Sequence, residues 1–303
     1  MKNKISFRFL FLALALGLFS ASCKKDETPA GPKSIAEIVN TNPNTTILKA
    51  AVERAGLGSA LSTGTLTVFA PDDAAFAASG LTLAAVNSLP VPTLDSILKY
   101  HVLAANVPSS AVPASDAVTT LLGTKLFASK NSNGVFVNGI SVKTADIAAS
   151  NGVIHIISKV LIPPTKTIAQ VAVGNPDFSL LVAAVAKAGL VPAISGEGKF
   201  TVFAPTNAAF NAAGFNSAAD INAAPTDLIT TVVKYHVITT NVFASDLTNG
   251  LTAPTLQGGN VTVNLSPARL KISTSANPSS NITTADIVCT NGVIHVIDRV
   301  LLP

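Results

Sequence analysis

Two stretches of the chain are almost identical: NGVIHIISKVLIP at residues 151–163 and NGVIHVIDRVLLP at residues 291–303. Each has a histidine, His155 or His295, in the middle of an apolar run. Because side chains alternate along a strand, valine and isoleucine flank the histidine on its own face, and isoleucine or valine occupies the opposite face. Both faces are therefore apolar, and the pattern predicts a histidine inside a protein core.

The similarity continues upstream of these stretches. Three further pairs repeat in the same order: SIAE 34–37 with TIAQ 167–170, TVFAP 67–71 with 201–205, and KYHV 99–102 with 234–237. The chain is therefore a duplication. The Pro163-Pro164 pair marks a short, stiff boundary, which predicts one domain over residues 33–163 and a second over 165–303.

The N-terminus has the features of an export signal. Lys2, Lys4 and Arg8 precede a short apolar run, and small residues lead to Cys23. The run is shorter than the roughly 20 residues of a membrane-spanning helix. We interpret residues 1–22 as a signal peptide and residues 23–32 as a tether. Ordinary cleavage near Ala21 is the alternative to a lipoprotein signal.

The placement of Cys23 resembles a bacterial lipoprotein cleavage site, which implies a lipid on this cysteine. The charged run KKDE that follows it resembles the tag that carries lipoproteins of Bacteroidetes-type bacteria to the outer face of the outer membrane. Cys289 is the other cysteine, and its counterpart in the first repeat is Ala149. This exchange predicts a small buried apolar residue rather than a reactive thiol.

The charge balance gives no sign of nucleic-acid binding. The chain has 20 Lys+Arg and 16 Asp+Glu, and three of the basic residues lie in the signal segment, so 17 − 16 leaves +1. A basic surface for nucleic acid needs a larger positive excess.

The order of elements in each repeat predicts a mixed α+β fold. Apolar residues at helical spacing run from Ile47 to Ala55 and meet Gly56, which is typical of a helix end. The TVFAP runs are typical of strands. Asp72 and Thr206 are placed to cap the short alanine-rich helices that follow.

The residues offer little support for catalysis, a metal or a cofactor. A zinc site needs three or four ligands, but each repeat has two histidines and no thiolate pair. No nucleophile elbow or phosphate-binding loop occurs. We therefore expect satisfied core histidines, with tyrosine hydroxyls and the Asn-Gly turn amides as candidate hydrogen-bond partners.

TVFAPTNAAF, the KYHV segment and NGVIHVIDRVLLP, in this order, resemble the fasciclin (FAS1) domain. The resemblance covers about residues 33–303. It implies an α+β fold of two small sheets in a β-wedge flanked by helices. It also implies non-enzymatic modules for adhesion that bind an extracellular protein or glycan.

The resemblance also implies candidate residues for partner binding and for the fold. The candidate partner-binding residues are Asp146, Ile147, Asp286, Ile287, Tyr100, His101, Tyr235 and His236. The structural motif comprises Asn151, Gly152, His155, Asn291, Gly292, His295 and Asp298. Ser158 replaces Asp298 in the first repeat, so the second repeat is the more typical copy.

The sequence thus favours a cell-surface adhesion lipoprotein anchored to the outer membrane. One alternative is an envelope accessory protein that binds a neighbouring membrane complex, for example in glycan capture. A third is a protein that binds a small ligand or pigment in an internal pocket. Separately, the segment Asp95-Ser96-Ile97 resembles a short O-glycosylation signature at Ser96.

Overall fold

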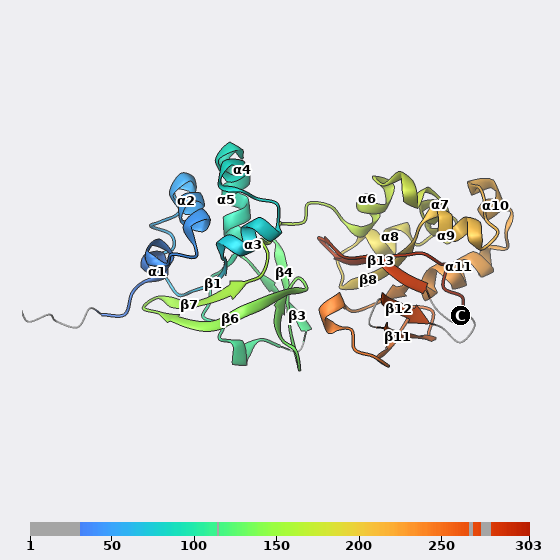
Figure 1. The fold of residues 1–303 in the computed structure, drawn as a ribbon. Helices are drawn as coiled ribbons and strands as arrows, with labels where there is room; N and C mark the ends of the chain where they lie inside the picture. The colour runs from blue at the N-terminus through green and yellow to red at the C-terminus, as the bar shows by residue number, and fades with distance from the viewer. Residues whose placement is uncertain (1–30, 114, 267–268, 274–279) are drawn as a thin grey trace, which may run out of the picture. The chain divides into compact units, whose positions relative to one another are not determined.

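The computed structural model describes residues 31–113, 115–266, 269–273 and 280–303. The signal segment, Cys23 and the KKDE run lie outside these residues. Residues 32–303 form one compact unit. It contains two domains with nearly the same order of elements (Figure 1).

The first domain begins with helices and ends with strands. Its elements are α1 (Ile35–Thr41), α2 (Thr46–Ala55), β1 (Leu66–Pro71), α3 (Asp73–Ala78), α4 (Leu83–Ser88), α5 (Val91–Tyr100), β2 (Val102–Leu103), η1 (Ser109–Ala111), β3 (Ser115–Thr119), β4 (Lys125–Asn131), β5 (Gly134–Val137), β6 (Ile140–Ala149) and β7 (Gly152–Ile157).

The second domain repeats this order and adds the short helices η2 and α8. Its elements are α6 (Ile168–Val173), η2 (Pro176–Phe178), α7 (Ser179–Lys187), α8 (Val191–Ser195), β8 (Phe200–Pro205), α9 (Asn207–Ala212), α10 (Ala218–Ala223), α11 (Thr226–Tyr235), β9 (Val237–Ile238), η3 (Ala244–Asp246), β10 (Thr252–Pro254), β11 (Asn260–Ser266), β12 (Arg269–Ser273), β13 (Ser280–Cys289) and β14 (Gly292–Ile297). The predicted α+β class is confirmed.

One long strand in each domain belongs to two sheets. In the first domain the strand order is β2-β1-β7-β6-β5-β4-β3. The start of β6 pairs with β5 at Ile140 and Ser141, and the strand from Val142 to Ala149 pairs with β7. The β13 strand does the same in the second domain. These paired small sheets, with helices over one side (Figure 1), are the expected β-wedge.

Each domain has two apolar cores because both faces of its central strands are covered. On one face of β1 and β7, Val68 and Ile154 pack against the helices. On the other face, Phe69 and Ile157 pack inside the wedge with β4 and β5. The second domain has the same two clusters. The prediction that both faces of the NGVIH strand are apolar is confirmed.

The helix ends follow the local sequence signals. Helix α2 ends at Gly56, whose φ of 69° is left-handed. The Asp72 and Thr206 side chains accept backbone hydrogen bonds at the starts of α3 and α9, as predicted. Cys289 is fully buried, which raises the pKa of its thiol to about 12. No helix in the described ranges is long and apolar enough to cross a membrane.

Candidate functional site

The candidate binding residue Asp146 lies on a bulge in β6. The pairing with β7 shifts register between Thr144 and Ile147, and Asp146 there has a left-handed φ of 60°. Its N–H donates to Nδ1 of His155 at 3.2 Å. Its carboxylate accepts from the Ser109 hydroxyl and, at 2.7 Å, from the Ser109 N–H. The bulge therefore holds an exposed carboxylate in a fixed direction.

The charge at this position is stabilised by the same contacts. The hydrogen bonds from the hydroxyl and the N–H of Ser109 lower the pKa of Asp146. Lys130 reaches the same loop and donates to the Ser109 carbonyl at 3.2 Å. The site thus presents an ionised carboxylate beside a lysine on an open surface.

His155 supports the bulge from inside the core. Its Nε2 lies 2.9 Å from the Val107 carbonyl, and its Nδ1 accepts from Asp146, so hydrogen bonding assigns the proton to Nε2. The ring is buried and stacks on Phe69 at a centroid distance of 5.6 Å. His295 repeats the arrangement with Asp286, Val242 and Phe203.

The histidines are therefore buried and satisfied, as predicted, but the expected partners were wrong. Neither a tyrosine hydroxyl nor an Asn-Gly amide contacts His155; its partners are a bulge amide and a loop carbonyl. The position of the bulge could not be predicted from residue types, because a strand with one extra residue has the same kind of sequence pattern as a strand without it.

The Tyr-His motif lies inside the core. Nδ1 of His101 lies 2.8 Å from the Ile97 carbonyl, and Nε2 accepts from the Leu161 N–H at 2.9 Å. His236 makes the equivalent contacts. Burial lowers the pKa of both rings to about 4. Through these hydrogen bonds each ring links the segment after the last strand of its domain to helix α5 in the first domain or α11 in the second.

The tyrosines are equally enclosed. Tyr100 is fully buried; its hydroxyl donates to the Lys125 carbonyl at 3.0 Å and accepts from Asn138 at 2.9 Å. Tyr235 donates to the Asn260 carbonyl. Burial raises the pKa of Tyr100 to about 12. The four residues of the Tyr-His motifs therefore contribute no surface to a partner in this structure.

Asn151 and Gly152 join the first helix to the last strand. The Asn151 side chain accepts from Ile35 N–H at 2.9 Å and donates to the Leu61 carbonyl at 2.9 Å. Gly152 has a φ of 145°, and a Cβ there would lie 1.8 Å from the Leu66 carbonyl oxygen. Asn291 and Gly292 have the same roles in the second domain.

The remaining motif residues are structural or half-buried. Ile147 and Ile287 are half-buried against their helical cores. Asp298 accepts from the N–H and the side chain of Asn281. At the corresponding place in the first domain, Ser158 bonds to Ser141, hydroxyl to hydroxyl, at 2.9 Å.

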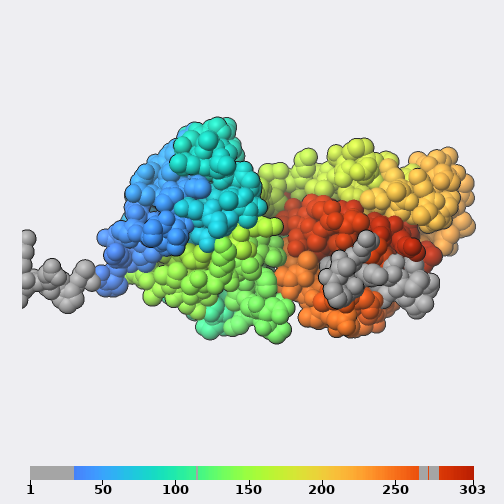
Figure 2. Space-filling view, viewed as in Figure 1, coloured from blue at the N-terminus to red at the C-terminus, as the bar shows by residue number. Residues whose placement is uncertain are grey.

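The second copy of the carboxylate site lies against the first domain. Phe127 in β4 packs on Phe243, with a centroid distance of 5.9 Å, and on Val293. The Ser129 hydroxyl donates to Asp246 at 2.7 Å, and the Asn131 amide donates to the Ser245 carbonyl at 2.8 Å. We call these contacts of residues 127–131 with 243–246 the interdomain clasp; Figure 2 shows the two domains in surface contact.

The clasp changes the environment of Asp286. This residue has the same φ of 60° as Asp146, and its carboxylate accepts from the Ala244 N–H at 2.8 Å. However, it is half-buried, and burial raises its pKa, whereas the pKa of Asp146 is lowered. The two copies of one motif are therefore chemically different.

The clasp residues were not predicted from the sequence. The two repeats differ at these positions, and that difference was a usable signal. The tyrosine hydroxyls bond to the carbonyls of Lys125 and Asn260, so Phe127 corresponds to Thr262. The buried histidines bond to the carbonyls of Val107 and Val242, so Phe243 corresponds to Pro108. A residue that forms the contact between the two domains does not need an equivalent at the matching position of the other domain.

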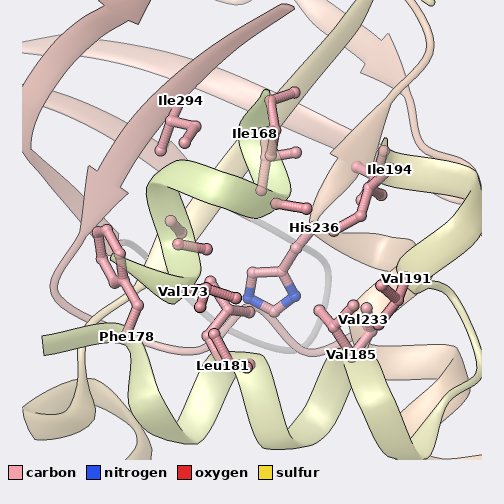
Figure 3. Close-up of a pocket in the computed structure, with 16 residues that line it drawn as sticks. Ile168, Val173, Phe178, Leu181, Val185, Val191, Ile194, Val233, His236 and Ile294 are labelled. Carbon is pink, nitrogen blue, oxygen red and sulfur yellow. The ribbon is translucent and has the colours of Figure 1, made fainter. Parts of the chain in front are cut away.

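Each domain also has a small apolar cavity beside its Tyr-His histidine. In the second domain it measures about 50 Å³ and is lined by Phe178, Leu181 and His236, among others (Figure 3). The matching cavity next to His101 has the same volume of about 50 Å³. Pockets for small ligands are usually about 300–1,000 Å³. These cavities therefore do not support the hypothesis of a pigment or ligand pocket.

The chemistry of the histidines argues against a metal or acid–base role. All four use both ring nitrogens in backbone hydrogen bonds. Within the described part of the chain, no group of three or more His, Cys, Asp and Glu side chains could hold a metal ion. The arrangement that remains is a scaffold that presents the carboxylate of Asp146 at the surface.

Comparison with known proteins identifies this scaffold. The Fasciclin domain model matches residues 43–163 and 176–303, so the chain belongs to the fasciclin domain family. It is 31% identical over 253 residues to transforming growth factor-beta-induced protein ig-h3 of Sus scrofa, covering 79% of this chain and 35% of that protein. The chain thus spans about a third of that relative.

A smaller relative is matched over most of its length. Protein sll1483 of Synechocystis sp. is 38% identical over 149 residues, which is 49% of this chain and 79% of that protein. A solved FAS1 domain pair from the insect cell adhesion molecule fasciclin I is similar with a TM-score of 0.43 and 21% identity, covering 85% of this chain and 96% of that one.

Proposed function

We propose that the protein is a non-enzymatic binding protein of the bacterial cell surface that mediates adhesion through its fasciclin domains. A lipid on Cys23 would anchor it to the outer membrane, and its partner would be an extracellular protein or glycan. Family membership supports a binding role, and histidines occupied by backbone groups offer no general base. The export signal and the KKDE run support surface display.

The first domain carries the binding surface in this proposal. The observation behind it is the contrast between Asp146, which is exposed, and Asp286, which is half-buried and faces Gly139 of the first domain. Asp146 is ionised, fixed by Ser109 and accompanied by Lys130, so it can pair with a cation or accept donors from a partner. The chain would then bind one partner rather than two.

The matched variants Asp146→Asn and Asp286→Asn test this site. Asparagine tolerates the left-handed backbone of both bulges, so the fold is retained while one charge is removed. Cells expressing each variant are tested for attachment to immobilised matrix proteins and a panel of neutral glycans. Asp146→Asn is expected to lower attachment at least about tenfold and Asp286→Asn to leave it unchanged. Equal attachment of wild type and Asp146→Asn would contradict the assignment.

Location is tested by protease treatment of intact cells. Loss of the protein while a periplasmic marker survives is the expected result. A Cys23→Ala variant should leave the membrane fraction. Full protection from protease would instead favour an envelope accessory protein that binds a neighbouring membrane complex. Neutralising the KKDE charges separates the two hypotheses, because surface display should then fail.

A further inference from the structure

A cleft of about 790 Å³ lies where the two domains meet. The first domain contributes the β5–β6 hairpin and residues 158–163. Pro164 lies at the boundary, and the second domain contributes residues 165–166, Val171 in α6 and Ala285, Asp286 and Val288 of β13. The volume falls within the range of about 300–1,000 Å³ that small-ligand pockets occupy, and such pockets occur preferentially between domains.

Two lysines line the cleft from opposite sides of the domain boundary. Lys159 follows β7 of the first domain, and Lys166 precedes α6 of the second. Neither ammonium group forms an ion pair or a side-chain hydrogen bond with another residue in the ranges that the structure describes. Lys159 interacts electrostatically with Asp286 in the same cleft, and the two exposed ammonium groups across the cleft favour an anionic ligand.

The other polar groups are suited to hydroxyl-rich molecules. The hydroxyls of Ser141 and Ser158 lie side by side at 2.9 Å in the cleft wall. Oδ1 of Asp286 accepts from the Ala244 N–H. Oδ2 of Asp286 faces Gly139 at the cleft, where a Cβ built on the glycine would lie 3.0 Å from Oδ2. Hydroxyl and carboxylate oxygens both accept hydrogen bonds from ligand hydroxyls.

An aromatic side chain completes the wall. Phe136 in β5 lies in the strand pairing opposite Ser129, and it is half-buried at the cleft. Val135 and Val137 turn into the core, so Phe136 is the residue of this strand left on the interdomain face. An aromatic ring of this kind packs against the apolar face of a sugar ring.

From these groups we propose that the interdomain cleft binds an acidic oligosaccharide. Lys159 and Lys166 bind its carboxylates, Ser141, Ser158 and Asp286 bind its hydroxyls, and Phe136 packs on a ring face. The cleft exists only while the clasp holds the domains together. It is separate from the Asp146 surface, so binding here does not depend on the adhesion proposed above.

The test uses the full chain purified in detergent and isothermal titration calorimetry. The probes are a short oligogalacturonate and a neutral maltooligosaccharide of the same length. The wild type is compared with the double variant Lys159→Ala/Lys166→Ala. The control Lys49→Ala/Lys125→Ala removes the same charge from a half-buried and an exposed lysine outside the cleft. Phe127→Ala opens the clasp without touching a lysine.

Oligogalacturonate is expected to bind at least about tenfold more tightly than the neutral oligosaccharide. The cleft double variant and Phe127→Ala should each lose about tenfold or more, while the control stays within about twofold. Asp146→Asn should bind like wild type, which separates this site from the adhesion surface. Absence of binding, or equal loss in the cleft and control variants, would overturn the proposal.

Discussion

The rings of Phe127 in the first domain and Phe243 in the second pack at a centroid distance of 5.9 Å. Neither aromatic residue has an aromatic counterpart in the other repeat, because Thr262 and Pro108 occupy those places. This contact, with the adjacent hydrogen bond from Ser129 to Asp246, couples two domains that are otherwise copies of one another.

Phe127→Ala should uncouple the domains. It removes one of the two aromatic rings of a small apolar cluster, and truncation of a buried phenylalanine to alanine costs about 3–5 kcal/mol. The wild type is expected to unfold in one calorimetric transition, and the variant in two. Phe127→Leu, which keeps apolar volume, should retain a single transition. Two transitions already present in the wild type would show that the clasp does not couple the domains.

His295→Ala should destabilise the second domain. The change leaves the Asp286 N–H and the Val242 carbonyl without their partner and removes the stack on Phe203. Unsatisfied buried groups cost about 1–3 kcal/mol, so we expect a loss of about 2–4 kcal/mol in chemical denaturation. Thr290→Ala, on the exposed turn of the same hairpin, serves as the control. An unchanged denaturation midpoint would contradict the structural role.

Acid should weaken the fold through His101 and His236. Burial lowers their pKa from 6.5 to about 4, so the unfolded chain binds more protons than the folded one between these values. Stability is therefore fully present above pH 6.5 and is lost as the pH falls towards 4, by on the order of 3 kcal/mol per histidine.

The pH window separates this effect from that of the carboxylates whose pKa is lowered. Asp73, Asp146 and Asp298 have lowered pKa values, so their contribution is lost only as the pH falls below their usual value of 3.8. Denaturation curves at intervals between pH 7 and pH 3 measure both phases. A free energy of unfolding that stays constant from pH 6.5 to 4 would refute the histidine prediction.

Gly152→Ala should be far more damaging than Gly80→Ala. Both glycines have positive φ, which costs roughly 1–2 kcal/mol for alanine. A Cβ at Gly152 would also lie 1.8 Å from the Leu66 carbonyl oxygen, whereas a Cβ at Gly80 meets nothing within 4 Å. Gly152→Ala is expected to break the β1–β7 pairing, measured as loss of the cooperative unfolding transition. Equal melting temperatures for the two variants would show that the backbone can shift and relieve the close contact between the new Cβ and the Leu66 carbonyl oxygen.

The structure confirms the predictions that depend on residues close to one another in the sequence. The duplication, the α2 helix that stops at Gly56, the caps at Asp72 and Thr206 and the buried Cys289 all follow from spacing and residue type. The two-sided burial of the NGVIH strand also followed from its apolar alternation. These features need no knowledge of distant segments.

The sequence by itself determined the family, the α+β class and the apolar setting of His155 and His295. Only the tertiary structure decided which backbone groups satisfy His155, because its partners, Asp146 and Val107, are brought to it by a bulge and a loop. Likewise, only the tertiary structure distinguishes Asp146 from Asp286. The same residue in the same motif is exposed in one domain and half-buried in the other, because exposure depends on what packs against a surface and not on the residues that form it.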